Sequence, residues 1–141
     1  ASDAPRHPAC HRSRRLMRLS PALAEFVAER HLAVLATQRA DGSPHAVPVG
    51  FTYADGVVRV ITFGPSVKAA NARRSGRASV TQIDGTRWVT LEGAVRVLDD
   101  AASVASAVAA YARRYRQPKE RDDRVVIEIE VDRVMCNSGL K

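Results

Sequence analysis

The sequence predicts a mainly β fold, a six-stranded antiparallel β-barrel with peripheral helices, and three observations support this prediction. Asp-Gly pairs at positions 41–42, 55–56 and 84–85 lie between apolar runs, a strong short-range signal of a β-hairpin. Three helical patterns interrupt six strand patterns in the order α-β-β-β-α-β-β-α-β. A chain of 141 residues suffices for one such domain and not for two, and closure into a barrel removes exposed strand edges.

The first half of the domain is predicted to be one helix followed by a three-strand meander. Ser20 and Pro21 have the pattern of an N-cap followed by proline at the first helical position, and Leu19, Leu23 and Phe26 begin an apolar stripe. This pattern predicts a helix of roughly ten residues. Strands rich in β-branched and aliphatic residues are then expected at residues 31–38, 45–53 and 57–63.

The second half begins with a short helix after the Gly64-Pro65 turn, with Ser66 at its start and Gly76 just past its end. Strands are expected at residues 77–83 and 87–98, and Gly93 in the longer one predicts a bulge or bend. The Asp99-Asp100 pair is expected to cap a third helix that ends before Pro118. Residues 124–134 alternate apolar and charged side chains, as a half-exposed strand does.

The positive charge of the chain is concentrated at its start. Residues 1–18 hold five Arg and one Asp, a net +4, which leaves 7 − 4 = +3 for residues 19–141, the expected single domain. We expect the first segment to be a basic, disordered tail. Met17 directly precedes the first helix, which raises the hypothesis that the residues before it are not native.

Composition also excludes several partners. No aromatic residue lies in the tail to stack on bases, so we expect no nucleic-acid partner. No apolar run approaches the roughly 18 residues of a membrane span, and no secretory signal is apparent, so we expect a cytoplasmic protein with no membrane partner. The two cysteines suggest no disulfide framework. The HPACH run at residues 7–11 offers three potential zinc ligands in a segment expected to be disordered, whereas a structural zinc site needs four in a defined spacing, so no metal is expected.

The stretch from Val60 to Gly76 holds a candidate anion site. A helix that starts near Ser66 would direct its unpaired N–H groups and the positive end of its dipole beyond the strand. Lys68 would lie in its first turn, and lysine is scarce here, with three among 22 basic residues. On this stretch alone, a phosphate site and an ordinary helix with a solvated lysine both remain open.

Few other residues suggest chemistry. His31, at a helix-strand junction, is interpreted as structural, whereas His45 begins a strand and could face a cofactor. Glu92 is interpreted as an outward-facing residue of its strand. Neither a G-x-S-x-G nor a G-x-G-x-x-G motif is present, which argues against hydrolysis and a Rossmann dinucleotide site. This combination favours an enzyme whose cofactor carries the chemistry.

Three stretches together resemble a known family: ERHLAVLATQRADGSPHAVPVGF, VITFGPSVKAANARRSG and QIDGTRWVTLEGAVRV. They are similar to the flavin and deazaflavin oxidoreductases with the pyridoxamine-phosphate-oxidase-like split barrel, an FMN-binding type of fold. Within that superfamily the chain most resembles the actinobacterial branch that uses coenzyme F420, including the F420-dependent biliverdin reductases. The resemblance runs from about Leu19 to Val134, and the basic tail has no counterpart in it.

The resemblance implies a set of cofactor-binding residues. Residues of the second strand would lie along the deazaflavin ring, with main-chain groups at its polar edge: His45, Ala46, Val47, Pro48 and Val49. Thr62 and Phe63 would lead to the phosphate, which Ser66, Lys68 and Asn71 would hold. Arg87 and Trp88 would stand where a second subunit closes over the cofactor. Arg73 and Arg74 are interpreted either as contacts for the acidic end of the cofactor or as a solvated helix face.

The implied reaction is hydride transfer from reduced F420 to a conjugated small-molecule acceptor, with biliverdin to bilirubin as the specific prediction. The proton would come from solvent or from Arg39, and no dedicated acid is expected. Four cations near the end of the last helix could meet the propionates of a bilin or form an ordinary solvated helix end: Arg113, Arg114, Arg116 and Lys119. The resemblance also implies a homodimer with cofactor sites between subunits.

Three alternatives remain open. An FMN-dependent oxidase or reductase of the same fold would share the phosphate site, so FMN is the alternative cofactor. A non-catalytic cofactor or haem-binding barrel would need His31 or His45 at the iron. A nucleic-acid binder would act through residues 1–16 and would show strongly salt-dependent binding. Pyridoxamine-phosphate oxidase itself fits less well, because the chain is short and lacks the C-terminal segment that those enzymes use on substrate.

Overall fold

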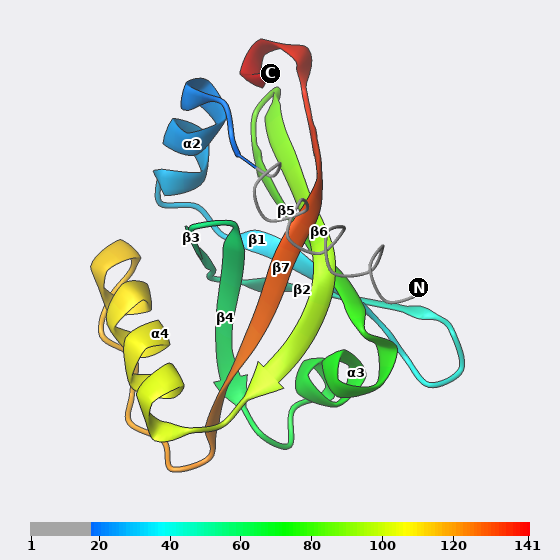
Figure 1. The fold of residues 1–141 in the computed structure, drawn as a ribbon, viewed down its shortest axis with the longest axis vertical. Coiled ribbons are helices and arrows are strands. Elements are labelled where there is room, and N and C mark those ends of the chain that lie inside the picture. The colour runs from blue at the N-terminus through cyan, green and yellow to red at the C-terminus, as the bar shows by residue number, and fades with distance from the viewer. Residues whose placement is uncertain (1–17) are drawn as a thin grey trace, which may run out of the picture.

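The computed structural model describes residues 18–141 (Figure 1). The expectations for the basic tail, including the HPACH run, therefore lie outside the described residues. The described residues form the α-helices α2 (Pro21–Ala28), α3 (Val67–Ser75) and α4 (Ala101–Arg114) and a short 3-10 helix at Ser138–Leu140. The strands are β1 (Ala33–Gln38), β2 (Pro44–Val49), β3 (Thr52–Ala54), β4 (Val57–Phe63), β5 (Arg77–Asp84), β6 (Arg87–Leu98) and β7 (Arg124–Cys136).

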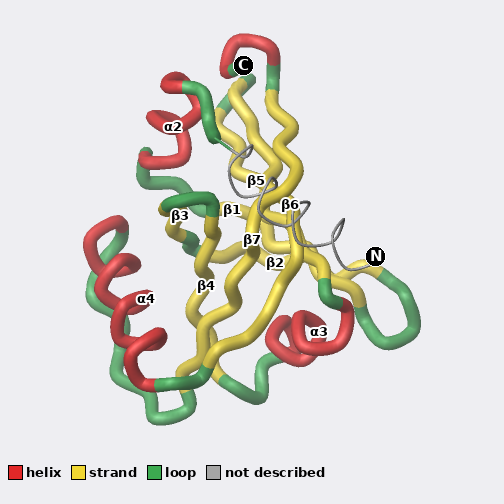
Figure 2. Tube along the Cα trace, in the orientation of Figure 1, coloured by secondary structure: helices red, strands yellow, loops and turns green. Residues whose placement is uncertain are grey.

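The sheet follows the predicted hairpins but contains seven strands, not six. Its order is β2-β1-β5-β6-β7-β4-β3, and every pairing is antiparallel. The long strands curve around a common interior, with α4 beside β4 on one side and α3 on the other (Figures 1 and 2). The two edge strands, β2 and β3, are consecutive in the chain and separated only by Gly50 and Phe51.

The extra strand arises because the predicted strand at residues 45–53 is interrupted at Gly50. A Cβ atom at Gly50 would lie 2.8 Å from the ring of Tyr111, closer than real Cβ contacts, and 3.0 Å from the ring of Tyr115, tighter than most such contacts. The backbone N–H of Phe51 donates to the hydroxyl of Tyr115 at 3.2 Å instead of to a neighbouring strand. The chain therefore changes partner here, from β1 before Gly50 to β4 after Phe51.

Gly93 produces the bulge that the sequence predicts. The register of β6 against β7 shifts between Glu92 and Gly93. A Cβ atom at Gly93 would lie 1.8 Å from the carbonyl oxygen of Glu130, so only glycine fits this close approach of two backbones. The bulge lets the long β6 strand bend around the barrel.

The predicted helix caps are also confirmed. Ser20 accepts a hydrogen bond from the Leu23 N–H at 3.1 Å, and its own hydroxyl donates to the Leu140 carbonyl at 2.7 Å, which ties the first helix to the end of the chain. Asp100 accepts from the Ser103 N–H at 3.0 Å. Gly76 ends α3 with a φ of 78°, the left-handed conformation that favours glycine.

The core fills the interior of the barrel and the contact with α2. Its largest fully buried side chains come from α2, β1, β6, β7 and the β2–β3 junction: Phe26, Leu35, Phe51, Leu91, Ile127 and Ile129. Among the described residues, no helix is long and apolar enough to cross a membrane. The cytoplasmic location expected from the sequence stays a prediction.

Candidate cofactor site at the start of helix α3

The turn between β4 and α3 is fixed by backbone hydrogen bonds. The Gly64 N–H donates to the Asp123 carbonyl at 2.7 Å, and the Ser66 N–H donates to the Phe63 carbonyl at 3.0 Å. Arg73 adds a third contact by donating to the Gly64 carbonyl at 3.1 Å. The first turn of α3 is therefore held in one position relative to the barrel.

Ser66 is the N-cap of this helix, as predicted. Its hydroxyl oxygen accepts from the Ala69 N–H at 3.2 Å, and the residue is only 5% exposed. Because the hydroxyl is used there as an acceptor, its proton remains available to a ligand. The N–H groups of Val67 and Lys68 have no carbonyl partner within the helix, since a helix leaves its first N–H groups unpaired. Together these donors and the helix dipole favour an anion.

Lys68 lies half-buried in the same turn. Burial lowers the pKa of its ammonium group. Within residues 18–141, the structure records no hydrogen bond or ion pair for this side chain. A partly desolvated cation without a counter-charge gains most when an anion binds beside it. Lys68 therefore fits the phosphate contact predicted for it.

Asn71, the third expected phosphate contact, is used inside the chain. It is buried, and its side-chain amide donates to the Thr37 hydroxyl at 3.1 Å. The amide oxygen accepts from Arg74 at 2.8 Å, and Arg74 also donates to the Gln38 carbonyl at 2.5 Å. These contacts anchor α3 to β1. A direct contact between Asn71 and phosphate stays a prediction, and it would have to share or replace one of these hydrogen bonds.

His45 lies on β2 directly opposite Thr37 of β1. Its Nδ1 atom is buried and has no hydrogen-bond partner among the described residues. An unsatisfied buried nitrogen is costly, so a ligand that offers it a partner would stabilise the protein. This orphaned atom and Lys68 are the two features that the expected cofactor would satisfy.

The other expected ring contacts lie on the same edge strand. Along β2, the exposed residues Ala46 and Pro48 alternate with the half-buried Val47 and the buried Val49. Among residues 18–141, strand β2 pairs with β1 alone, so within this part of the chain its other edge carries unpaired backbone groups. Pro48 has no N–H, which blocks pairing with another strand while leaving neighbouring main-chain groups free. This edge suits the main-chain contacts predicted along the cofactor ring.

Thr62 and Phe63 end strand β4 directly before the turn. Thr62 is buried on the interior face, opposite Val125 of β7. The Arg121 guanidinium lies 4.5 Å from the centre of the Phe63 ring. Both residues thus support the base of the turn, and a direct contact of either with the cofactor stays a prediction. Arg39 lies in the β1–β2 turn, where it donates to the Pro44 carbonyl at 2.5 Å.

Arg87 and Trp88 are not brought to α3 within one chain. They begin β6 at the tip of the β5–β6 hairpin, whereas α3 leads into the other end of β5 (Figure 1). Arg87 donates two hydrogen bonds to Glu29, at 2.8 and 2.9 Å, and one to Asp84 at 2.5 Å. Trp88 is 36% exposed. Their predicted contact with the cofactor therefore requires a second subunit.

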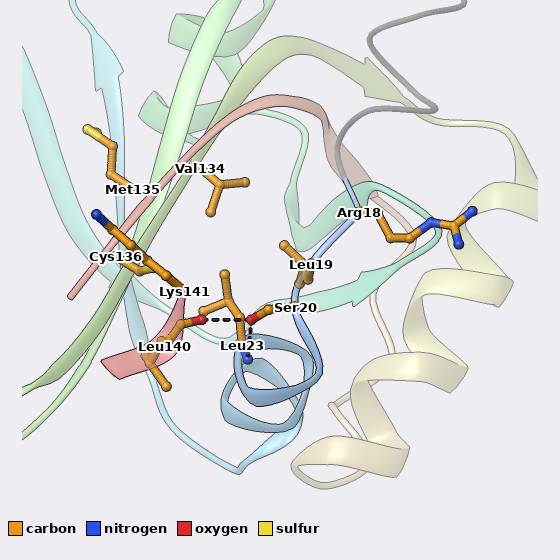
Figure 3. Close-up of a pocket in the computed structure, with 9 residues that line it drawn as sticks. All are labelled: Arg18, Leu19, Ser20, Leu23, Val134, Met135, Cys136, Leu140 and Lys141. Atoms are coloured by element: carbon orange, nitrogen blue, oxygen red, sulfur yellow. Dashed lines mark hydrogen bonds between the residues drawn. The ribbon is translucent and has the colours of Figure 1, made fainter. Parts of the chain in front are cut away.

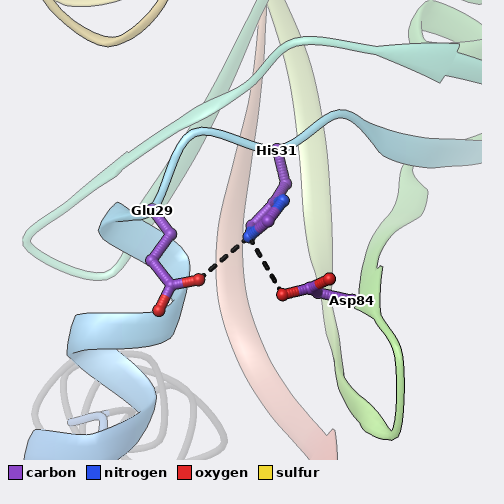
Figure 4. A group of neighbouring side chains, drawn as sticks. All are labelled: Glu29, His31 and Asp84. Atoms are coloured by element: carbon purple, nitrogen blue, oxygen red, sulfur yellow. Dashed lines mark hydrogen bonds and ion pairs between the residues drawn. The ribbon is translucent and has the colours of Figure 1, made fainter.

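His31 is structural, as the sequence analysis interpreted it. Its Nε2 lies 2.9 Å from Glu29 Oε1 and 3.7 Å from Asp84 Oδ2 (Figure 4). Potential metal-ligating atoms of these three residues lie within 4.8 Å of one another. The Arg87 guanidinium already pairs with both carboxylates, so a metal ion would have to displace that cation. A hydrogen bond from Arg87, the larger cause, and one from His31 lower the pKa of the Glu29 carboxyl to about 2.

The four cations near the end of α4 do not form one cluster. Arg113, Arg116 and Lys119 are exposed, but Arg114 is half-buried. Arg114 donates from Nε and Nη2 to the Glu29 carbonyl at 3.2 and 2.5 Å. The interpretation of Arg114 as a solvated or propionate-binding residue is therefore wrong, because its donors are already used by buried acceptors.

The remaining partners of Arg114 are polar groups that the sequence analysis missed. Arg114 donates to the Gln82 side-chain oxygen at 2.7 Å and to the Phe51 carbonyl. Gln82 is fully buried and donates to the Phe26 carbonyl at 2.9 Å. The one available signal was the two-residue alternation of β5, which puts Gln82 on the same interior face as Ala78 and Val80.

A separate concavity of about 550 Å³ lies between α2 and the end of β7 (Figure 3). Its lining comes from residues 18–23 and 134–141 and includes no residue of α3. Its lining is mainly apolar and includes the free thiol of Cys136. It contains none of the residues predicted for the cofactor. Volume alone therefore does not locate the candidate site, which we assign from the chemistry at α3.

Comparisons with known proteins agree with this fold. The pyridoxamine 5′-phosphate oxidase family matches residues 19–136. The chain is 50% identical over 125 residues to the F420H(2)-dependent biliverdin reductase of Mycobacterium tuberculosis, covering 87% of this chain and 91% of that protein. Together these matches confirm the expected split-barrel class.

Solved structures give the same result. A conserved hypothetical protein of Mycobacterium tuberculosis, Rv2991, superposes with a TM-score of 0.74 at 27% identity, over 84% of each chain. An F420 reductase superposes with a TM-score of 0.68 at 22% identity, over 79% of this chain and 94% of the other. At that identity the second likeness shows the fold alone.

Proposed function

The chain belongs to the pyridoxamine 5′-phosphate oxidase family, and from this premise we propose that it is an F420-dependent reductase whose acceptor is biliverdin. The observation that carries the proposal is the 50% identity to an F420H(2)-dependent biliverdin reductase, which extends over 91% of that protein. The site adds independent support, because the start of α3 carries Lys68, which has no recorded partner within residues 18–141, together with the Ser66 hydroxyl and the first helix N–H groups, and such groups favour an anion.

The chain's own residues would bind and orient the cofactor. Lys68 and Ser66, with the first N–H groups of α3, would hold its phosphate. The free edge of β2 would lie along the ring, and His45 Nδ1 would gain the partner it lacks. When bound, reduced F420 supplies the hydride. The second hydrogen is a proton, which solvent can deliver; Arg39 as its source stays a prediction, and a guanidinium gives up its proton poorly.

We infer that a second copy of the chain completes this site. Exposed apolar side chains lie on β1, β5, β6 and β7 and just before β1: Leu32, Val34, Ile83, Trp88 and Met135. Cross-strand pairing puts Val34 beside Thr81, Thr81 beside Thr90, and Thr90 beside Met135 on one face. Ile83 and Trp88 form the next pair along that face. This face thus carries exposed apolar side chains around the Thr81–Thr90 pair, and a surface with several exposed apolar side chains favours pairing with a second subunit.

The test is a pair of titrations of the purified protein with F420 and with FMN, followed by fluorescence. We expect tight binding of F420 and weak binding of FMN. Lys68→Gln should weaken F420 binding by roughly ten- to hundredfold, since a hydrogen bond to a charged group contributes about 1.5–3 kcal/mol. Lys119→Gln, which removes an exposed lysine in the loop between α4 and β7, is the matched control and should bind F420 normally.

Activity is then measured as the loss of biliverdin absorbance in the presence of reduced F420. Preferential binding of FMN would replace the F420 assignment with the flavin alternative. If the protein binds F420 but leaves biliverdin unchanged, F420 stays the proposed cofactor and biliverdin is rejected as the substrate. Failure to bind either cofactor would overturn the oxidoreductase proposal, and a haem absorption band would then favour the carrier alternative.

A further inference from the structure

Residues of α2, β3, β4 and α4 line a cavity of about 330 Å³. Figure 1 shows α2, β3 and α4 on the side of the barrel opposite α3. Val27 of α2, Ala110 of α4, and Tyr53 and Ala54 of β3 give it apolar walls. It shares no lining residue with the cofactor site proposed above. Its volume lies at the small end of the range of about 300–1,000 Å³ typical of ligand pockets.

The charged residues in this cavity are all positive. Arg59, Arg113 and Arg114 line it, and none of its described lining residues is acidic. Three guanidinium groups gathered around apolar walls are an unusual arrangement, because each repels the others and each is costly to desolvate. The arrangement calls for a compensating negative charge.

The described part of the chain compensates only one of the three. Arg59 pairs with Glu128 at 2.9 Å, but that carboxylate also pairs with Arg96 at 2.9 Å. Arg114 donates only to neutral oxygens, two of them backbone carbonyls and one the Gln82 amide. Burial lowers the pKa of Arg114, as expected for a cation without an anionic partner.

Arg113 is the group that can meet a ligand. It is exposed, and across residues 18–141 the structure records no hydrogen bond or ion pair for its side chain. Arg113 lies in the last turn of α4, where its positive charge interacts favourably with the negative end of the helix dipole. That interaction uses none of its five N–H donors. Arg113 therefore combines a free, fork-shaped donor set with an adjacent apolar cavity.

We propose that this cavity is a second ligand site, which takes a small carboxylate with an apolar body. The carboxylate pairs with Arg113 in the field of Arg114 and Arg59, and the apolar body packs between Val27, Ala110 and the Tyr53 ring. A planar guanidinium matches a carboxylate through two parallel hydrogen bonds. The proposal does not depend on the identity of the cofactor at α3.

The probe is phenylacetate, titrated calorimetrically into the full chain, with phenylacetamide as its uncharged counterpart. We expect phenylacetate to bind about fivefold more tightly than the amide, the upper end for an ion pair that solvent still reaches. Arg113→Gln should remove that preference. Arg116→Gln, which loses an exposed charge near the same helix end but outside the cavity, should keep it.

Two further measurements make the test specific to this cavity. Ala110→Leu fills the apolar wall and should abolish binding of both compounds; its far-UV circular dichroism reports whether it has folded. Saturation with phenylacetate should leave the affinity for F420 unchanged. Equal binding of phenylacetate and its amide, absence of binding at millimolar concentration, or equal losses in Arg113→Gln and Arg116→Gln would overturn the proposal.

Discussion

The side-chain amide of Asn71 donates a hydrogen bond of 3.1 Å to the hydroxyl of Thr37, and both residues are buried. Asn71 lies on α3 and Thr37 on β1, so this pair links the helix of the candidate site to the sheet. The opposite neighbour of Thr37 is His45, whose Nδ1 lacks a partner. At this end of the barrel, the hydrogen bond between Asn71 and Thr37 therefore fixes α3, whereas Nδ1 of His45 remains available to a ligand.

Asn71→Ala should destabilise the fold by about 1–3 kcal/mol, because it leaves the Thr37 hydroxyl buried without its donor. Thr37→Val should cost less, and the double variant should cost less than the sum of the two. Urea unfolding of the four proteins measures this coupling. Additive losses would show that the hydrogen bond does not link the two elements.

Gly93→Ala should destabilise the protein by about 3 kcal/mol or more, since its Cβ would lie 1.8 Å from the Glu130 carbonyl oxygen and two backbones would have to separate. Gly139→Ala is the matched control, because its Cβ would meet only the Asn137 side chain, at 3.5 Å. Thermal unfolding followed by circular dichroism compares the two. A Gly93→Ala protein as stable as the control would contradict the close approach.

Gly93 and Gly50 show which features of the fold could be predicted from the sequence and which could not. Gly93 was predictable as a bulge because glycine in a strand signals a local backbone requirement. The caps Ser20, Ser66 and Asp100 were predictable for the same reason, since a cap acts within three residues. The break at Gly50 was missed because its cause, the rings of Tyr111 and Tyr115, lies more than 60 residues away in the chain.

The candidate site was partly predictable on the same grounds. The placement of Ser66 and Lys68 at the start of α3 was predictable because a helix start is a local feature of the sequence, and their contact with phosphate stays a prediction. The internal role of Asn71 was not found, because its partner Thr37 lies 34 residues away. Arg114 was misinterpreted because cations at the end of a helix are usually solvated, and only the packing of α4 shows that Arg114 points inward.

Arg114→Gln should be among the most destabilising substitutions in the protein, with a loss of about 3 kcal/mol or more. It would leave the Glu29 carbonyl and the Gln82 side-chain oxygen without their Arg114 donor, and the Phe51 carbonyl with only the Tyr115 hydroxyl at 3.3 Å. Arg113→Gln, one residue earlier and exposed, should change stability by at most about 0.5 kcal/mol. Denaturant midpoints measure both, and similar values would contradict the structural role of Arg114.

Tyr115→Phe tests the hydrogen bonds of the Tyr115 hydroxyl, which lie beside those of Arg114. The Tyr115 hydroxyl donates to the His31 carbonyl at 2.6 Å and accepts from the Phe51 N–H at 3.2 Å. Its removal should cost about 1–3 kcal/mol, because a buried donor and acceptor both lose a partner. Tyr111→Phe is the control, since the structure records only a ring contact for Tyr111 in this region. Equal losses in the two variants would assign the effect to ring packing.

Cofactor binding should weaken as the pH is raised through the pKa of Lys68. Burial lowers that pKa below its ordinary value of 10.5, so the ammonium loses its proton earlier than an exposed lysine would. A bound phosphate favours the protonated form, and its affinity must therefore fall with deprotonation. Titrations of F420 at several alkaline pH values measure this, and Lys68→Gln should lack the dependence. A wild-type affinity that is constant across this range would exclude Lys68 from the phosphate contact.

Arg87→Met should remove an acid-dependent part of stability. Hydrogen bonds from Arg87 hold the pKa of Glu29 at about 2, below its ordinary value of 4.5. A carboxyl whose pKa is lowered by folding contributes stability above its unfolded pKa, and this contribution is lost as the pH falls toward the folded value. The difference in denaturant midpoint between the wild type and Arg87→Met should therefore be largest above pH 4.5 and shrink toward about pH 2. Other carboxyls titrate in the same pH range, so the comparison uses this difference and not either midpoint alone. A difference that stays constant with pH would show that the pairing of Glu29 with Arg87 does not stabilise the fold.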